Sequence, residues 1–162
     1  HYPELPRLHR DGLRVMVLAG EFEGHQAPTR VYTPLIALDL RGEGETTLPL
    51  RRDFEHGALM LTGRGEVAGE PIEPGELLYL GMGRDSVDLR LHDDAELLLI
   101  GGEPFEEELI LFWNFVGRTH EEVEAWVREW NDQGAKSRFG EVLGYNGPRT
   151  RSPELTARLR PR

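Results

Sequence analysis

The sequence predicts an all-β fold, a sandwich or a barrel, with one helix near its C-terminal end. Three observations lead to this prediction. Short apolar segments of strand-like composition recur about every 8–12 residues through the first two-thirds of the chain. Glycine and proline separate these segments, as they do in turns. After Thr119 the apolar residues change from alternation to a helical period, which indicates a single helix.

The strand-like segments come first and follow one another closely. Ser86–Leu91 shows the strictest alternation, which is typical of a strand with one buried face. Pro34 ends one segment, and the Gly-containing stretches Arg41–Gly44 and Gly63–Gly65 are predicted as turns. The predicted strands are 13–20, 30–33, 35–40, 46–50, 57–62, 66–68, 76–80, 86–91 and 96–102.

The pattern changes after residue 108. Leu109–Gly117 is mostly apolar and is predicted as one buried strand. Thr119–Glu122 has the form of a capping box, in which the Thr hydroxyl accepts from the third amide while the Glu reaches back. A helix over about 119–132 is therefore predicted, with one apolar face formed by Val123, Trp126, Val127 and Trp130.

Aromatic residues are concentrated around this helix. They are expected to form core between the helix and the barrel, with a stacking platform as the alternative. If part of the set faces outward, it would form a surface left bare by a missing domain. The set consists of Phe112, Trp113, Phe115, Trp126 and Trp130.

Composition limits the function classes. With 162 residues, 38% apolar and 30% charged, the chain is long enough for one folded domain. A net charge of −10 disfavours direct binding of nucleic acid. The absence of cysteine excludes disulfides, thiol nucleophiles and thiolate metal sites. No apolar run has the length of a membrane span and no signal peptide opens the chain, so we expect a cytoplasmic protein.

The last fifteen residues have a different charge balance. Residues 148–162 contain five arginines and one glutamate, whereas the chain as a whole is acidic. We expect this basic tail to be solvated or loosely tethered, as chain ends often are. The alternative is a docking role against an acidic surface of a partner.

Three stretches of the sequence resemble the pirin family. The first stretch lies at the start of the predicted barrel. The second runs from the last predicted barrel strand into the predicted helix, and the third follows that helix. The second is the most specific, and the resemblance covers nearly all residues up to Arg149. It implies a cupin-like double-stranded β-helix barrel, or jelly roll, with one C-terminal α-helix. The matching residues are 17–22, Pro28 and 33–35; then 101–104 and 112–122; then 138–142 and 144–145.

The resemblance also implies a place for this chain in a longer protein. Pirins look like bicupins, in which a metal-binding N-terminal cupin precedes the half seen here. His1–Pro6 resembles the linker between the halves, and the chain starts with His instead of Met. We therefore expect a C-terminal half, with a barrel, helix and closing segment over 1–147 and a basic tail over 148–162.

The cupin metal motifs can be compared with this sequence residue by residue. The first motif has His-x-His, then Glu, then Gly; Gly63 aligns with that glycine, and His56 falls at the Glu position. The two His positions then lie within Leu48–Arg52, where no histidine occurs. In the second motif Pro74–Gly75 supply the turn, but Leu78 stands at the ligand histidine. One histidine does not hold a functional metal. We therefore expect no catalytic, cofactor-binding or metal-binding residue in this chain, and iron or another divalent metal in the N-terminal cupin.

Three residues are candidates for lining a pocket inside the barrel: His56, Met60 and Leu78. His56 is expected at the rim or in a hydrogen bond, with an inward-facing imidazole as the alternative. The main hypothesis is a metal-free structural and protein-interaction domain of a redox or regulatory protein. A second is part of a quercetin 2,3-dioxygenase-like enzyme whose active site lies in the N-terminal half. A third is a metal-free barrel that binds a small apolar ligand. The expected partners are the N-terminal cupin half and a further protein, without nucleic acid or membrane.

Overall fold

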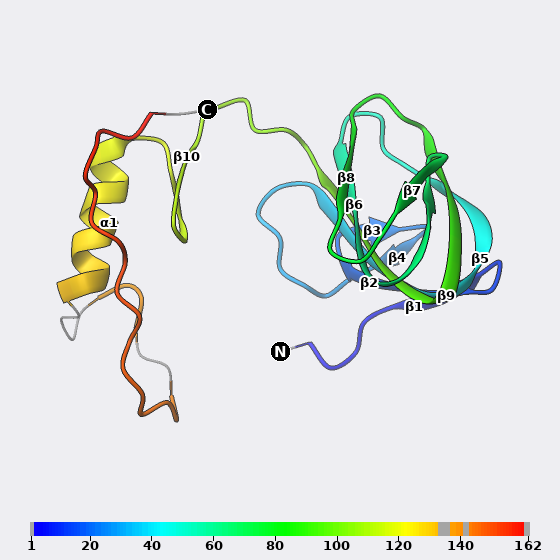
Figure 1. Cartoon of the computed structure of the whole chain (residues 1–162), viewed down its shortest axis with the longest axis horizontal. Helices are drawn as coiled ribbons and strands as arrows, with labels where there is room; N and C mark the ends of the chain where they lie inside the picture. Colours follow the sequence, from blue (N-terminus) through cyan, green and yellow to red (C-terminus); the bar gives the residue numbers. More distant parts are fainter. Residues whose placement is uncertain (1, 133–136, 141–142, 161–162) are drawn as a thin grey trace. The chain divides into compact units, whose positions relative to one another are not determined.

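The computed structural model of the chain describes residues 2–132, 137–140 and 143–160 (Figure 1). The chain divides into two compact units, His1–Pro104 and Phe105–Arg162, which we call unit 1 and unit 2. In the described residues, unit 1 contains strands β1 to β9, and unit 2 contains β10, β11 and helix α1. The predicted all-β fold with one C-terminal helix is confirmed. The boundary expected between residues 147 and 148 lies inside unit 2.

The strands of unit 1 form an antiparallel jelly roll. The main sheet has the order β1-β2-β5-β9-β6-β7, and β8 pairs with β6; β3 and β4 form a separate hairpin. Along the described strands this path stays open and does not close into a ring. The strands are β1 (Arg7–Arg10), β2 (Leu13–Ala19), β3 (Glu21–Phe22), β4 (His25–Gln26), β5 (Leu35–Pro49), β6 (Glu55–Val67), β7 (Glu70–Ile72), β8 (Leu77–Gly81) and β9 (Ser86–Gly102).

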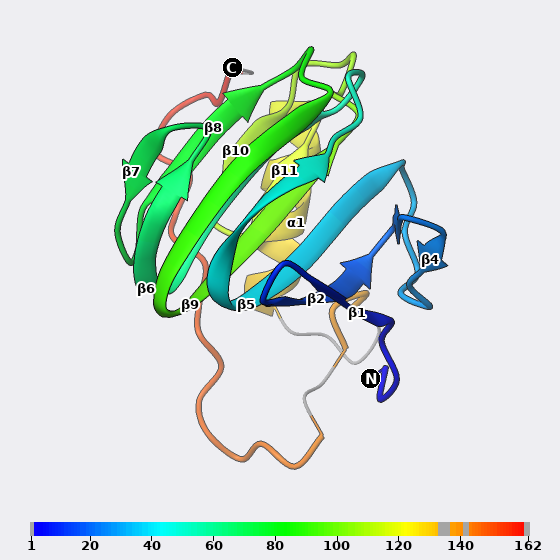
Figure 2. The same ribbon diagram turned by 90° about the vertical axis from the view of Figure 1, so that its right-hand side faces the viewer.

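Three of these strands are long and bent (Figure 2). The predicted turn at Arg41–Gly44 lies inside β5, where the pairing with β9 shifts between Gly42 and Gly44. The predicted turn at Gly63–Gly65 lies inside β6, where Gly63 has a φ of 75°. A Cβ on Gly63 would lie 2.5 Å from the Ala95 Cα. Glycine thus bends β5 and β6 without ending their ladders, and Asp93 and Asp94, with φ of 60° and 50°, lie at the bend of β9. In each case two predicted strands form one observed strand.

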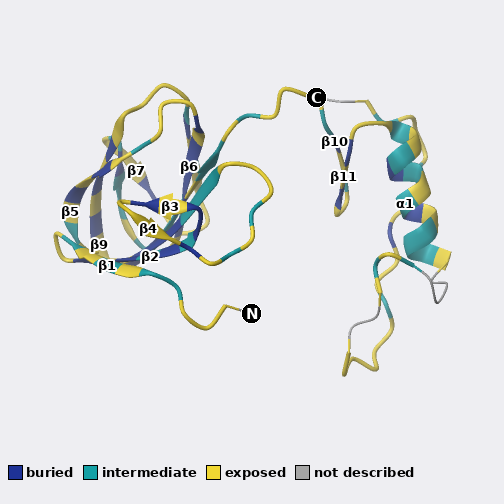
Figure 3. Ribbon diagram, turned by 180° about the vertical axis from the view of Figure 1, so that it is seen from behind, coloured by how far each residue is buried: buried dark blue, intermediate teal, exposed yellow. Residues whose placement is uncertain are grey.

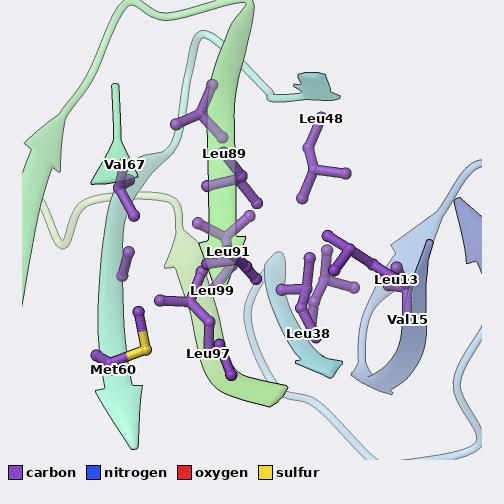
Figure 4. Close-up of a cluster of buried hydrophobic side chains, with 14 of the residues drawn as sticks. Leu13, Val15, Leu38, Leu48, Met60, Val67, Leu89, Leu91, Leu97 and Leu99 are labelled. Atoms are coloured by element: carbon purple, nitrogen blue, oxygen red, sulfur yellow. The ribbon is translucent and has the colours of Figure 1, made fainter. Parts of the chain in front are cut away.

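The core of unit 1 follows from alternation along these strands. Figure 3 shows buried and exposed residues alternating along β5 and β9. In β9, Leu97 and Leu99 are buried in the core, whereas Ile100 is exposed. Figure 4 shows side chains from β2, β5, β6 and β9 directed toward one another, among them Leu38 and Met60. The bent strands thereby enclose one apolar interior.

Two local predictions in unit 1 are wrong or incomplete. Arg30–Thr33 is not a strand, because Pro34 follows and no neighbouring strand pairs with it. The short strands β1, β3, β4 and β7 were not predicted, since their composition is mostly charged or polar and β7 contains Pro71. In the described part of the chain, no helix is both long and apolar enough to cross a membrane.

Unit 2 begins with a hairpin where one strand was predicted. The strands β10 (Ile110–Phe112) and β11 (Phe115–Gly117) pair with Phe112 opposite Phe115. The chain reverses at Trp113, whose φ is 50°. The Trp113 ring packs edge-on to Trp130, with centroids 5.3 Å apart, and this contact holds the unusual backbone in place.

Helix α1 (His120–Asp132) starts at the predicted capping box. The Glu122 N–H donates to Thr119 Oγ1 at 3.1 Å, and the Thr119 N–H donates to Glu122 Oε2 at 3.3 Å. Aromatic rings from the hairpin and the helix meet around Phe115, which lies 5.7 Å from Phe139 between ring centroids. Four residues of the predicted aromatic set, Phe112, Phe115, Trp126 and Trp130, thus belong to or pack against the core of unit 2, whereas Trp113 is 37% exposed.

The described part of the basic tail is bonded to α1. Trp130 Nε1 donates to the Thr150 carbonyl at 2.8 Å, and the Ser152 N–H donates to Asn131 Oδ1 at 3.0 Å. The Leu159 N–H donates to His120 Nδ1 at 3.1 Å. The tail up to residue 160 is therefore tethered along the helix, more closely than the sequence suggested. In the predicted closing segment, residues 141–142 lie outside the described residues, as do 133–134 at the predicted helix end.

Candidate functional site

The positions that would hold a cupin metal contain one histidine, His56, with a leucine at position 78 and only leucine, proline and arginine in the stretch Leu48–Arg52. Leu78, at the ligand histidine of the second motif, pairs with Ala58 across β6 and packs against the core of unit 1. Met60 is fully buried in the same core. In the residues that the structure describes, no three His, Asp or Glu side chains come together as a metal site. The side chains present at these positions therefore do not fit a metal ion.

A cavity of about 420 Å³ opens in unit 1 beside His56. We call it the His56 cavity. Its walls come from the β3–β4 hairpin, both ends of the bent strand β5, the loop before β6, and β9. The apolar lining is formed by Phe22, Val31, Pro34, Leu35, Ile36, Leu38, Pro49, Leu50, Phe54 and Leu99. Apolar walls and this volume are typical of sites for small molecules.

The three predicted pocket residues do not come together in this cavity. His56 lines it, whereas Met60 and Leu78 belong to or pack against the core. The sequence missed two aromatic residues of the lining: Phe22 on the β3–β4 hairpin, and Phe54 before β6, whose ring centroid lies 6.0 Å from that of His56. No local sequence pattern marks either residue as pocket-lining. Their place in the lining depends on how segments far apart in the sequence pack together.

His56 is the one buried titratable ring in the described lining of the cavity. The residue is 2% exposed, and its Nδ1 has no hydrogen-bond partner. Burial lowers the pKa of His56 below its ordinary value, while the Phe54 backbone and the Asp53 charge oppose the shift. The ring is therefore neutral at pH 7 and offers one donor and one acceptor.

A glycine makes room for this ring. Gly101 on β9 pairs with His56 on β6, and a Cβ at Gly101 would lie 2.5 Å from His56 Cδ2. The same atom would lie 2.7 Å from the Glu55 carbonyl oxygen. The imidazole thus occupies space that any other residue at position 101 would need. The position of His56 is specified by two strands.

The charged groups at the rim are already paired. Arg51 Nε donates to Asp53 Oδ1 at 3.1 Å, and the guanidinium lies 4.1 Å from the centre of the Phe54 ring. This hydrogen bond lowers the pKa of Asp53. Glu23 is paired with Arg10. The cavity is therefore apolar inside, with a rim whose cation is neutralised.

A second cavity, of about 680 Å³, lies beside Thr46 and is lined mostly by polar side chains. Arg90 reaches Glu45 at 2.8 Å and Glu66 at 2.9 Å across its wall. Thr46 donates to Asp11 at 2.6 Å. These charged and hydroxyl groups already form hydrogen bonds and ion pairs with one another. They therefore give no indication of a ligand in this cavity.

The outer face of unit 1 carries an apolar surface. Leu77 is 61% exposed, Tyr79 65% and Ile100 44%. They lie side by side, because Gly57 pairs with both Tyr79 and Ile100, and a Cβ there would meet Leu77 and Ile100. Glu55 raises the pKa of Tyr79 through a hydrogen bond. We call this surface the β8 face; it consists of Leu59, Leu77, Tyr79, Leu98 and Ile100.

Comparison with known proteins finds a matching protein family and related sequences that agree with it. Residues 35–137 match the pirin C-terminal cupin domain. A Pseudomonas aeruginosa protein, named provisionally as a quercetin 2,3-dioxygenase, is 42% identical over 157 residues, which cover 96% of this chain and 49% of that protein. Human pirin is 30% identical over 128 residues, covering 74% of this chain and 44% of pirin.

A solved structure agrees with these relatives. The crystal structure of quercetin 2,3-dioxygenase from Acinetobacter baumannii matches with a TM-score of 0.90 and 36% identity. The match covers 99% of this chain and 54% of that protein. The chain thus spans about half the length of the relatives it matches.

Proposed function

Because the chain belongs to the pirin family, whose C-terminal cupin domain it matches, we propose that it acts as a metal-free cupin. In this role it supports a second, N-terminal cupin that binds iron or another divalent metal. It also presents a surface for a protein partner in a redox or regulatory protein. The observation that carries the proposal is Leu78, a partly buried apolar side chain that packs against the core at the position of a metal ligand.

The ligand positions support the metal-free part of the proposal. With Leu78 packed against the core, no group of three possible ligand side chains forms around His56 in the described residues. A single imidazole does not hold a divalent ion in competition with water. Replacing a ligand by leucine also removes the need for metal in folding, since the interior is filled by apolar contacts.

The β8 face supports the second part. An apolar surface on the outside of a sheet marks a contact with another protein surface more often than it faces water. Its proposed occupant is the N-terminal cupin, because the relatives are about twice as long as this chain. Leu77 and Tyr79 are the residues expected to be buried in that contact.

Metal content tests the metal-free assignment. The 162-residue chain is loaded in turn with iron, manganese and zinc, passed over a desalting column, and analysed by mass spectrometry. We expect far less than one ion per chain, and no change in His56→Ala. One tightly held ion per chain, lost in His56→Ala, would contradict the assignment.

Hydrogen exchange tests the docking surface. Amides of β8 are compared between the 162-residue chain and the longer protein that contains it with its N-terminal cupin. We expect slower exchange in the longer protein, and loss of that protection in Leu77→Lys. Leu111→Lys is the matched control, because Leu111 is 76% exposed on the hairpin of unit 2. Equal exchange of β8 in both proteins would rule out this contact.

The alternative is that the chain forms part of a quercetin 2,3-dioxygenase-like enzyme. Its support is the 36% identity to the Acinetobacter baumannii enzyme over nearly the whole chain. The metal and the reacting substrate would then lie in the N-terminal cupin. Oxygen uptake with quercetin, present in the longer protein and lost on chelation, is the expected result. No uptake by the longer protein with full metal content would exclude this alternative.

The proposed setting is the cytoplasm. The absence of cysteine supports it, because the fold then depends on no disulfide and suits a reducing compartment. Fractionation of cells that produce the longer protein tests this, with recovery in the membrane or extracellular fraction as the contrary outcome.

A further inference from the structure

We propose that His120 is a pH-sensitive latch for the basic tail. The neutral imidazole holds residues 155–160 against the start of helix α1, and protonation of the ring releases them. The latch lies wholly in unit 2, whereas the metal-free role concerns unit 1, so either proposal can fail without the other.

The tail runs along the whole of helix α1 (Figure 1). Near the end of the helix, Trp130 Nε1 donates to the Thr150 carbonyl. At the first residue of the helix, the Leu159 N–H donates to His120 Nδ1. The side chains of Leu155 and Leu159 pack against the core of unit 2. Different side chains therefore hold the two parts of the tail.

The hydrogen bond at His120 has only one possible direction. A backbone N–H only donates, so His120 Nδ1, which lies 3.1 Å from the Leu159 nitrogen, is the acceptor. An imidazole nitrogen accepts only while it carries no proton, because both nitrogens of a protonated imidazole are donors. Protonation therefore replaces this bond by two N–H groups that face each other. Among acceptor side chains, histidine is the one that ordinarily makes this change near neutral pH.

The surroundings of the ring do not compensate an added positive charge. His120 is the first residue of α1, where the helix dipole disfavours a cation. Glu121 is paired with Arg158 of the tail at 2.8 Å, so its attraction to a protonated imidazole is shared. Glu122 accepts hydrogen bonds from the two N–H groups that precede the helix, and the β10–β11 hairpin contains no charged residue. The charged residues next to the ring along the helix, before it and on the tail are Glu121, Glu122 and Glu124, Arg118, and Arg158 and Arg160.

The other part of the tail is held by groups that do not titrate in the same range. The Ser152 N–H donates to Asn131 Oδ1 at 3.0 Å, and neither group takes up a proton between roughly pH 5 and 8. The same is true of the bond from the Trp130 indole to the Thr150 carbonyl. Protonation of the imidazole therefore releases only the last part of the tail and uncovers the apolar surface at the start of α1.

The experiment follows the ¹⁵N-labelled 162-residue chain by NMR from about pH 7.5 to about pH 5. Long-range ¹H–¹⁵N spectra report the protonation of His120, and we expect its ring nitrogens and the Leu159 amide to shift with the same midpoint. Protection of the Leu159 amide from hydrogen exchange, relative to an unfolded chain at the same pH, should fall roughly twofold to tenfold. The Trp130 indole N–H should not shift with that midpoint, because its bond to Thr150 is kept.

Two variants separate protonation of this ring from general effects of acid. His120→Asn places an amide oxygen near the position of Nδ1 that accepts at any pH, so the Leu159 amide should stay protected at about pH 5. His120→Ala removes the acceptor, and the amide should be less protected at both pH values. His9→Ala is the matched control and should behave as the wild type, because His9 is exposed on β1 in unit 1.

Three results of the wild-type titration would overturn the latch. They are different midpoints for the Leu159 amide and the His120 nitrogens, no uptake of a proton by His120 above about pH 5, and an amide that is unprotected already at about pH 7.5. Loss of protection in acid by His120→Asn, to the same extent as in the wild type, would overturn it as well. The wild-type titration decides the matter even where a variant does not fold.

Discussion

Gly101→Ala tests how closely the two strands are fitted around His56. The added Cβ would lie 2.5 Å from His56 Cδ2 and 2.7 Å from the Glu55 carbonyl oxygen. The carbonyl belongs to the backbone of β6, and the residue His56 is 2% exposed, so its ring is closely surrounded. Since β6 and β9 are paired on both sides of this point, the strand cannot move away without breaking its ladder.

The magnitude follows from two opposing effects. Overpacking of this kind costs about 1–3 kcal/mol. Replacing glycine by alanine restricts the unfolded chain and returns about 0.4–1 kcal/mol, because Gly101 does not need a positive φ. We therefore expect a net loss of about 1–2 kcal/mol in the free energy of unfolding of unit 1.

Urea unfolding followed by far-UV circular dichroism measures this loss, since most strands lie in unit 1. Tryptophan fluorescence reports on unit 2, because Trp113, Trp126 and Trp130 all lie there. Gly57→Ala is the matched control: it lies on the same strand pair, and its Cβ would meet nothing closer than 3.4 Å. If Gly101→Ala were as well tolerated as Gly57→Ala, the close fit around His56 would be refuted.

Three further predictions concern single contacts. Thr119→Ala removes the capping hydroxyl of α1 and is expected to destabilise unit 2 by about 1 kcal/mol, measured by tryptophan fluorescence in urea. Arg149→Ala removes a guanidinium 3.8 Å from the Trp130 ring centre and is expected to cost about 0.5–1 kcal/mol by the same assay, with Arg151→Ala near neutral. Burial lowers the pKa of His56, so the unfolded chain takes up this proton first as the pH falls. Stability should therefore decline as the pH falls through the ordinary histidine range near 6.5, and His56→Phe, unlike His9→Phe, should flatten that decline.

The strands were predictable wherever burial alternates along the chain. In Ser86–Leu91 the side chains alternate between exposed and buried, and the sequence shows the same alternation. The ends of strands were less predictable. Glycine at positive φ serves equally in a turn and in a bulge, and the difference depends on the partner strand. At Gly63 the partner is β9, which follows more than twenty residues later.

The hairpin of unit 2 shows a different limit. An apolar run from Leu109 to Gly117 indicates a buried strand, and a tryptophan gives no turn signal. The reversal at Trp113 is held by packing on Trp130, which lies on the helix. The local turn signal here is Asn114, which follows Trp113 in the turn, and it was not recognised because the residues around it are mostly apolar.

The candidate site was partly predictable from the sequence. The presence of Leu78 and the presence of His56 in it have different physical causes. Leu78 at a ligand position could be recognised from the sequence, and its packing against the core follows from hydrophobic burial of part of its side chain. His56 has no such explanation, because an unsatisfied buried nitrogen opposes folding by about 1–3 kcal/mol. Stability thus accounts for the loss of the metal position but not for the imidazole beside it.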